Sequence, residues 1–168
     1  MEIKEIEKDL SHFGQDLIKE ILGSCVIKEF PKKTELIREG QFVKVVPIVL
    51  KGLVKVFIGK DEKELLLYYI HPQETCIMSF SASLKNEKSK IYAITEEESA
   101  ILLIPSDELS RWVTDYPKIN QLFYQQFDLR YAELIVTINH LLFDKLEKRL
   151  LDYLSEKISV TGKNPIKI

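Results

Sequence analysis

Residues 45–59 read VVPIVLKGLVKVFIG, two runs of branched apolar residues on either side of a Lys-Gly pair. Valine, isoleucine and phenylalanine favour extended strands, and glycine is common in the tight turns between them. Further segments between residues 25 and 105 have the same strand character: VIKEF, TELIREG, KELLLYYI, KIYAI and SAILLIP. Turn-forming residues separate them at intervals of roughly ten residues, which is typical of an antiparallel sandwich or barrel. We therefore expect a β-roll, with Pro47 at a sheet edge or a bulge.

Helical periodicity flanks the strand region on both sides. Apolar residues recur at intervals of three and four between Met1 and Leu22, which predicts helices that cover a core with one face. After Pro105 a short helix is expected from Ser106, and a much longer one from Pro117. The predicted fold class is mainly β with flanking helices, a jelly-roll-like double-stranded β-helix followed by a long α-helix.

The long helix carries apolar residues at heptad spacing, which is typical of a helix that pairs with a twin. We therefore expect a homodimer interface formed by Tyr124, Phe127, Tyr131, Leu134, Ile138 and Leu141. A second stripe, which faces the sheet domain in this interpretation, consists of Ile119, Leu122, Leu129, Val136 and Phe143. The alternative, in which both stripes are the core of one bundle, stays open but is less favoured.

The sequence Asp144-Lys145-Leu146-Glu147 has the spacing of a capping box and so predicts a new helix start within apparently continuous helix. We expect a hinge at Phe143 and Asp144. The predicted organisation is a β-roll effector domain with N-terminal helices (1–115), a dimerisation helix (116–143), and a hinge helix followed by the start of a further domain (144–168).

Composition excludes several classes of function. The net charge of −2 gives no electrostatic footprint for nucleic acid, so we expect no DNA binding by this chain alone. No apolar run is long enough for a membrane span, and the N-terminus is not a secretion signal, so we expect a cytoplasmic protein. Cys25 and Cys76 form no CxxC pair, which argues against zinc or an iron-sulfur cluster. No GxSxG, P-loop or HExxH motif occurs, and we do not expect an enzyme.

The order of elements resembles the effector half of the Crp/Fnr family of bacterial transcription regulators. The segments that carry the resemblance are FPKKTELIREGQ (30–41), VLKGLVKVF (49–57), LYYIHPQE (67–74), AILLIPSDEL (100–109) and EKRLLDYL (147–154). The resemblance implies a roll of the cyclic-nucleotide-binding-domain type with about eight strands, an allosteric sensor and a dimer. It also implies that DNA is bound only through a C-terminal helix-turn-helix domain, which this sequence lacks.

The stretch ETCIMSFSASLKNEKSK, residues 74–90, lies where cyclic-nucleotide-binding relatives hold the phosphate-binding cassette. In such relatives a glutamate fixes the ribose and an arginine pairs with the cyclic phosphate. Here the matching places read Cys76-Ile77-Met78 and Glu87-Lys88, and the positions that present hydroxyls to the base match Leu134 and Ile135. We therefore do not expect cyclic AMP by the usual route.

Two interpretations of this serine- and lysine-rich stretch remain open. In one, serine hydroxyls and the N–H groups at the start of a short helix receive an anionic or carboxylate-bearing effector, with a lysine as the counter-charge. In the other, which is favoured, the serines cap a turn and the lysines are solvated. The candidate effector-binding residues are Met78, Ser79, Ser81, Ser83, Lys88, Lys90 and Tyr92.

The resemblance also raises haem as a possible cofactor, because some members of the family sense gases with it. Candidate iron ligands are His71, Cys76, Met78 and His140. His71 precedes a proline in a turn and His140 lies off the heptad seam, so ordinary exposed histidines are favoured.

The function that this sequence favours is control of DNA binding by a small ligand other than cyclic AMP by the usual route. Binding of that ligand, whose identity is unknown, would shift the packing of the dimer helices. Alternatives are a ligand-free dimer scaffold and a stand-alone cyclic-nucleotide-binding-like regulatory module without DNA binding. A cupin-like enzyme is disfavoured, because the strand region holds a single histidine, His71.

Overall fold

The computed structural model describes residues 10–60, 63–143 and 146–161. The chain divides into two compact units, Met1–Phe127 and Asp128–Ile168. All of the strands that the structure describes lie in the first unit, and the described part of the second is helical.

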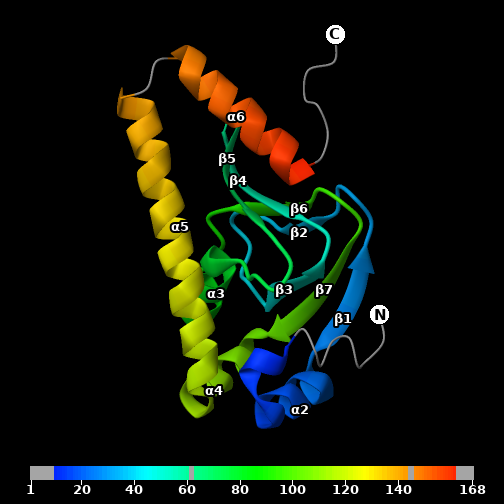
Figure 1. Cartoon of the computed structure of the whole chain (residues 1–168). Coiled ribbons are helices and arrows are strands. Elements are labelled where there is room, and N and C mark those ends of the chain that lie inside the picture. The colour runs from blue at the N-terminus through cyan, green and yellow to red at the C-terminus, as the bar shows by residue number, and fades with distance from the viewer. Residues whose placement is uncertain (1–9, 61–62, 144–145, 162–168) are drawn as a thin grey trace. The chain divides into compact units, whose positions relative to one another are not determined.

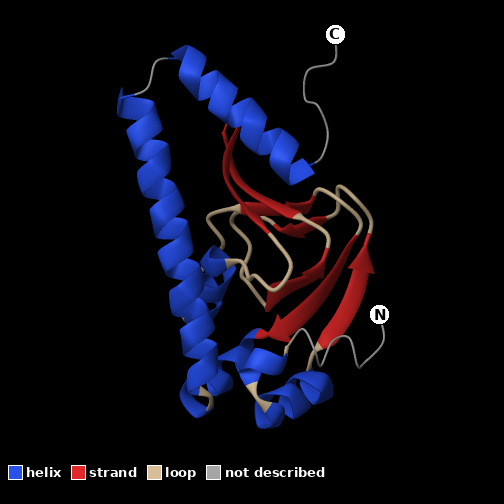
Figure 2. Ribbon diagram, in the orientation of Figure 1, coloured by secondary structure: helices blue, strands red, loops and turns tan. Residues whose placement is uncertain are grey.

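The strands of the described residues are β1 (Val26–Phe30), β2 (Glu35–Ile37), β3 (Val45–Lys51), β4 (Val54–Lys60), β5 (Lys63–Ile70), β6 (Tyr92–Thr95) and β7 (Ser99–Pro105). They form two antiparallel sheets, one in the order β1-β7-β3 and one in the order β2-β6-β4-β5 (Figure 2). The predicted fold class, a jelly-roll-like β-roll with helices, is confirmed. Seven strands are found in the described ranges, compared with the eight or so that the resemblance implies.

The helices of the described residues are η1 (Ser11–Phe13), α2 (Gln15–Ser24), α3 (Ile77–Leu84), α4 (Ser106–Asp115), α5 (Pro117–Phe143) and α6 (Leu146–Thr161) (Figure 1). The sequence predicted the starts of α4 and α5. Phe143 is the last residue of α5, whereas Asp144, the other predicted hinge residue, lies outside the described residues. None of the described helices is both long enough and apolar enough to cross a membrane.

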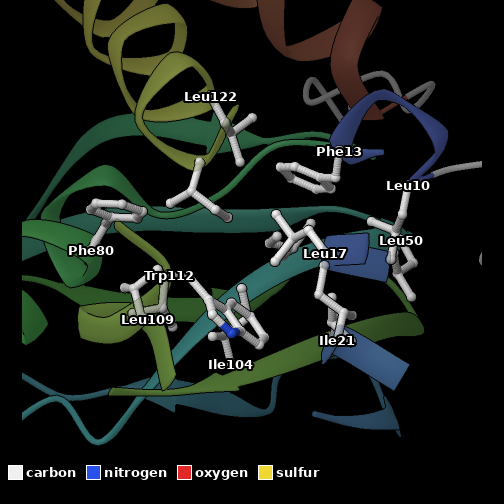
Figure 3. Packing of buried hydrophobic residues seen from close by; sticks show 14 of the residues in the cluster. Leu10, Phe13, Leu17, Ile21, Leu50, Phe80, Ile104, Leu109, Trp112 and Leu122 are labelled. Carbon is white, nitrogen blue, oxygen red and sulfur yellow. The ribbon is translucent and has the colours of Figure 1, made fainter. Parts of the chain in front are cut away.

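A first hydrophobic core lies where η1, α2, α4 and the start of α5 cover the β1-β7-β3 sheet (Figure 3). Alternate residues of β3 enter this core, and Val49 between them faces the other way into a second core. The period of two follows from the pleat of the strand. The largest side chain of the first core is that of Trp112, which is fully buried.

The second core fills the interior of the roll between the two sheets. Its members are all aliphatic or small side chains less than 9% exposed, namely Ile37, Val49, Val54, Val56, Ile70, Cys76, Ile91, Ala93 and Ile101. At one edge of this core the hydroxyl of Tyr68 lies 3.7 Å from Sγ of Cys76. The buried polar side chains of the described residues are Thr75, Ser79, Ser83, Ser89, Thr95, Ser99 and Gln126, and none of these is a carboxylate or a guanidinium.

Two turn and edge positions follow from the sequence. Gly52 joins β3 to β4 with φ +94°, and a Cβ there would lie 2.7 Å from the carbonyl oxygen of Glu98 and 2.8 Å from Cα of Ser99. Only glycine fits this conformation and this close backbone approach. Pro47 lies on β3, an edge strand of its sheet, as predicted.

Candidate functional site

The cassette stretch forms the helix α3 and the loop after it. The hydroxyl of Thr75 donates a 2.8 Å hydrogen bond to the carbonyl oxygen of Pro47, and an isolated β-bridge joins Thr75 to Ile48. Phe80 points from α3 into the first hydrophobic core. The start of α3 is therefore held against the edge strand β3.

The predicted serines are not gathered around a common point that faces solvent. The hydroxyl of Ser79 is buried and donates to the carbonyl oxygen of Cys76, 2.8 Å away, and Ser81 is half-buried. Ser83 is 7% exposed, and its Oγ has no hydrogen-bond partner among the described residues. Met78, by contrast, is exposed. The structure thus places the serine hydroxyls within the packing of α3.

Lys88 lies beside Phe42, a residue that the sequence did not single out. An isolated antiparallel bridge joins the two, and the Nζ atom of Lys88 lies 5.8 Å from the centroid of the Phe42 ring. The backbone N–H of Gly40 donates to the carbonyl of Ser89, and the N–H of Ser89 donates to the carbonyl of Gln41, both at 2.8 Å. Contacts between segments 40–42 and 88–89 therefore fix the end of the cassette loop.

A groove of about 600 Å³, here called the Lys88 groove, opens at this junction. It is lined by Leu36, Ile37, Arg38, Gly40, Gln41, Phe42, Val43, Lys44, Val45 and Lys88. Three of these residues are cationic and none is acidic. The volume lies in the range of small-molecule sites, roughly 300–1,000 Å³. The groove is the best candidate binding site among the described residues.

Tyr92 and Lys90 differ in their relation to the Lys88 groove. The ring of Tyr92 is half-buried and stacks on that of Phe57, with centroids 5.3 Å apart. The hydrogen bond and charge of the Glu35 carboxylate raise the pKa of Arg38, and Tyr92 makes a smaller electrostatic contribution in the same direction. Tyr92 itself does not line the groove. Lys90 is exposed and does not line it.

A second hollow, of about 540 Å³, lies between α2 and α4 and has both acidic and basic lining residues. Its arginine, Arg111, already bonds Glu20 at 2.5 Å and Glu108 at 2.6 Å. These bonds lower the pKa of Glu20 and raise that of Arg111. Because its arginine is bonded internally, this hollow is a weaker candidate for an anion than the Lys88 groove.

The predicted dimer seam is exposed along α5. Tyr124, Phe127, Tyr131, Leu134 and Ile138 are 69, 54, 56, 53 and 44% exposed, and the side chain of Leu141 lies outside the described residues. In the second stripe Ile119 and Leu122 are buried in the first core, as expected. Leu129 and Val136, which belong to the second unit, are 39 and 51% exposed, and for these two the contact with the sheet domain stays a prediction. The side chain of Phe143 is not among those described.

A chain of aromatic rings connects the cassette helix to this seam. Phe80 of α3 and Phe123 of α5 stack with centroids 4.6 Å apart. The ring of Phe123 also meets Tyr124 edge-on at 6.0 Å and Phe127 at 6.4 Å. The sequence pattern missed Phe123, because it falls between the two apolar stripes. The sequence signal that could have found Phe123 is its position as an aromatic residue directly before Tyr124, a predicted seam residue.

Three of the four haem candidates have described side chains, and they differ in exposure. His71 is exposed, and its backbone N–H donates to the Glu74 carboxylate at 2.9 Å. Cys76 is buried and Met78 is exposed, while the side chain of His140 lies outside the described residues. Among the residues that the structure describes, no group of three or more histidine, cysteine or acidic side chains is placed to hold a metal ion.

Comparisons with known proteins agree with this architecture. The model of the family described as "Cyclic nucleotide-binding domain" matches residues 27–116. A transcriptional regulator of the Crp/Fnr family from Eubacterium rectale is 19% identical, with a TM-score of 0.80 over 94% of this chain and 74% of that chain. A search of curated proteins finds no match.

Two further solved structures share the fold. The c-di-GMP responsive global regulator CLP of Xanthomonas campestris is 18% identical, with a TM-score of 0.73 over 84% of this chain and 70% of that chain. The CO-dependent transcription factor CooA of Carboxydothermus hydrogenoformans is 16% identical, with a TM-score of 0.64 over 95% of this chain and 67% of that chain. At these identities the structural likeness shows the fold. Together with the family match, it confirms the resemblance predicted from the sequence.

Proposed function

This chain belongs to the cyclic nucleotide-binding domain family, and from that premise we propose that it is the effector-sensing and dimerisation part of a Crp/Fnr-like transcription regulator. A small ligand bound beside the cassette would shift the packing of paired α5 helices and so control DNA binding. Residues 1–115 form the sensing domain in this proposal, 116–143 the dimerisation helix and 144–168 the hinge helix. Family and fold are those of regulatory binding domains.

The observation that carries the proposal is the stack of Phe80 on Phe123. Phe80 belongs to the cassette helix, and Phe123 contacts Phe127 of the seam. Packed protein interiors respond to a displacement by rearrangement and not by compression. A ligand that displaces α3, and with it the ring of Phe80, would therefore also move or rotate the ring of Phe123. Ligand binding and seam packing are thereby coupled through direct contact.

The exposed seam supports self-association. Five large apolar residues at heptad spacing are each at least 44% exposed on one helix. An apolar surface of this kind on a soluble protein commonly marks an interface, and the heptad spacing matches a second α-helix of the same sequence. We therefore assign the seam to a second copy of the chain.

The proposed ligand is not cyclic AMP held in the usual way. The interior of the roll is an apolar core, and the α5 positions that would meet the base are Leu134 and Ile135. A polar ligand in such surroundings loses its hydrogen bonds to water without replacement, at a cost of about 1–3 kcal/mol for each stranded group. Proteins that share this fold respond to different small molecules: CLP is c-di-GMP responsive and CooA is CO-dependent.

DNA contact is proposed to belong to a separate DNA-reading domain. The present chain has a net charge of −2 and so offers no basic surplus for phosphates. A dimer places two recognition helices one turn of duplex apart, and a small rotation of the dimer helices changes that spacing. In this way a ligand on the sensing domain would switch DNA binding without touching DNA.

Sedimentation velocity tests the proposal. We expect a dimer at tens of micromolar for the natural sequence and a monomer for Tyr131→Glu, which buries a carboxylate in the seam. Gln125→Glu introduces the same charge at an exposed position off the seam and should leave the dimer intact. A natural chain that sediments as a monomer, or a Tyr131→Glu variant that remains dimeric, would refute the seam. Mass spectrometry after native purification, with the Soret absorbance recorded, tests the ligand, and a co-purifying cyclic AMP would contradict its assignment.

A further inference from the structure

We propose that the Lys88 groove binds a small aromatic anion, a carboxylate or phosphate carried on a planar ring. This inference rests on the proposed function, since it names the chemical class of the ligand that the sensing domain receives. The groove lies outside the apolar interior of the roll.

The charges that line the groove select an anion. Arg38, Lys44 and Lys88 are its ionised residues, and no carboxylate lines it. The guanidinium of Arg38 is held by Glu35 at 2.6 Å, which leaves the two lysines as the available cations. Within the described part of the chain, no carboxylate lies within ion-pair distance of Lys44 or Lys88. Two unpaired ammonium groups facing one groove attract a negatively charged group, although the whole chain is slightly acidic.

The apolar part of the lining selects a ring. Phe42 is 54% exposed and Val45 is 38% exposed, and both line the groove with Leu36 and Val43. A planar ligand that covers Phe42 removes apolar surface from water and can pack offset against the aromatic ring. Lys88 already lies over one side of the Phe42 ring. A ligand ring against Phe42 therefore brings its charged substituent within reach of the Lys88 ammonium.

The walls of the groove are fixed in advance. Besides the bridge between Phe42 and Lys88, the hydroxyl of Ser106 donates to the carbonyl of Val43 at 2.9 Å. The backbone N–H of Ser106 donates to the carbonyl of Lys44 at 3.0 Å. Segment 40–45 is thus tied to the cassette loop on one side and to the start of α4 on the other. Pre-organised walls reduce the entropy lost when a small ligand binds.

The same contacts suggest how occupancy would be sensed. The Lys88 end of the groove belongs to the loop that follows α3, and the backbone N–H of Glu87 donates to the carbonyl of Ala82 in that helix at 2.8 Å. A ligand that draws Lys88 inward therefore pulls on the C-terminal end of α3. Phe80 of the same helix carries the contact to α5.

Titration calorimetry and ¹H–¹⁵N spectra with benzoate and phenyl phosphate test the groove. Benzyl alcohol supplies the ring alone and inorganic phosphate the charge alone. We expect both aromatic anions to bind at least tenfold more tightly than either half and to shift the amide resonances of residues 40–45 and 88. The tighter of the two identifies the charged group as carboxylate or phosphate.

Matched variants assign the contacts. Lys88→Gln should weaken binding of the tighter probe about tenfold, and Phe42→Ala about fivefold. Lys28 is the control, since its ammonium also lies over a phenylalanine ring, that of Phe30, at 5.2 Å but outside the groove. Lys28→Gln should change the affinity less than twofold. Circular dichroism confirms that each variant is folded; Lys88→Ala replaces Lys88→Gln, Phe42→Leu replaces Phe42→Ala, and Lys28→Ala replaces Lys28→Gln, where the first variant does not fold.

Three results would overturn the inference: no binding at millimolar probe concentrations, an equal loss for Lys88→Gln and Lys28→Gln, or shifts confined to other residues. Sedimentation keeps this outcome distinct from the proposed function. If Tyr131→Glu disrupts the dimer but neither aromatic anion binds the groove, the dimer proposal stands and only the proposed ligand class is rejected. If the aromatic anions bind the groove but the chain is monomeric at all concentrations, the dimer proposal is rejected and the ligand class stands.

Discussion

Phe80 of α3 and Phe123 of α5 stack with ring centroids 4.6 Å apart and planes inclined by 29°. Phe80 is 2% exposed in the first core, whereas Phe123 is half-buried and meets Tyr124 and Phe127 on its other sides. One ring therefore belongs to the packed interior of the sensing domain and the other to the base of the exposed seam. In the proposed function this contact is the route by which a change at the cassette reaches α5.

A double-mutant cycle measures this contact. Phe80→Leu and Phe123→Leu each keep an apolar side chain but lose the aromatic stack, and we expect a coupling free energy of about 1 kcal/mol in urea unfolding. Phe80→Leu combined with Phe57→Leu is the control, because Phe57 stacks on Tyr92 outside the first core. That pair should be additive to within about 0.5 kcal/mol. Additivity for Phe80 and Phe123 as well would show that the rings are not energetically coupled.

Gly52 provides a test of the roll itself. Gly52→Ala places a Cβ at φ +94° against backbone atoms of Glu98 and Ser99, so we expect a loss of about 2–4 kcal/mol in the free energy of unfolding. Gly23→Ala is the matched control, because Gly23 lies in α2 and a Cβ there would meet no atom within 4 Å apart from its chain neighbours and the adjacent backbone of the helix itself. Alanine there should stabilise the helix by up to about 1 kcal/mol. Equal effects of the two variants in urea unfolding would contradict this turn geometry.

Much of the fold follows from local sequence pattern. The segments VIKEF, KELLLYYI and SAILLIP correspond residue for residue to β1, β5 and β7. Branched residues bounded by turn signals suffice for this, because each strand is defined by its own composition. Pro47 has no backbone N–H to donate to a neighbouring strand, so its position in the sequence predicted an edge strand. The strand that contains it, β3, is indeed at the edge of its sheet. For the second stripe only Ile119 and Leu122 can be compared with the first core, and both are buried in it; periodicity alone does not say where along α5 such contact ends.

The candidate site was harder to predict, because the groove is assembled from distant segments. Lys88 was singled out through its place in the cassette, but Phe42 and Lys44 carry no motif. They join Lys88 only through an isolated bridge and two backbone hydrogen bonds around Ser89. Pairings of this kind depend on tertiary structure and leave no periodic signal in the sequence. The serines were singled out by the sequence but are not assembled into a site. Ser79, for example, donates its hydroxyl hydrogen bond to the carbonyl oxygen of Cys76, at the start of α3.

Two buried hydroxyls of the cassette predict opposite mutational effects. Ser83→Ala removes an Oγ that has no described partner, so we expect unchanged stability or a gain of up to about 1 kcal/mol. Thr75→Val keeps the side-chain shape but removes the hydrogen bond to Pro47, and should cost about 1–2 kcal/mol. Urea unfolding at fixed protein concentration measures both. A larger loss for Ser83→Ala than for Thr75→Val would mean that the Ser83 hydroxyl has a partner in solution.

The Cys25 thiol should be inert at neutral pH. Burial, with a smaller contribution from the Glu108 carboxylate, raises its pKa to about 12, so about one molecule in ten thousand carries the thiolate at pH 8. At pH 8 we expect iodoacetamide to modify Cys25 roughly a thousandfold more slowly in the folded chain than in the chain unfolded by guanidinium. Mass spectrometry of the peptide that contains Cys25 measures both rates. The rate should rise about tenfold per pH unit below pH 11. Because the unfolded thiol ionises first, at about pH 8.5, the thiol's contribution to stability falls as the pH rises from there toward 12. Equal rates for folded and unfolded protein at pH 8 would show that the thiol is neither buried nor influenced by Glu108.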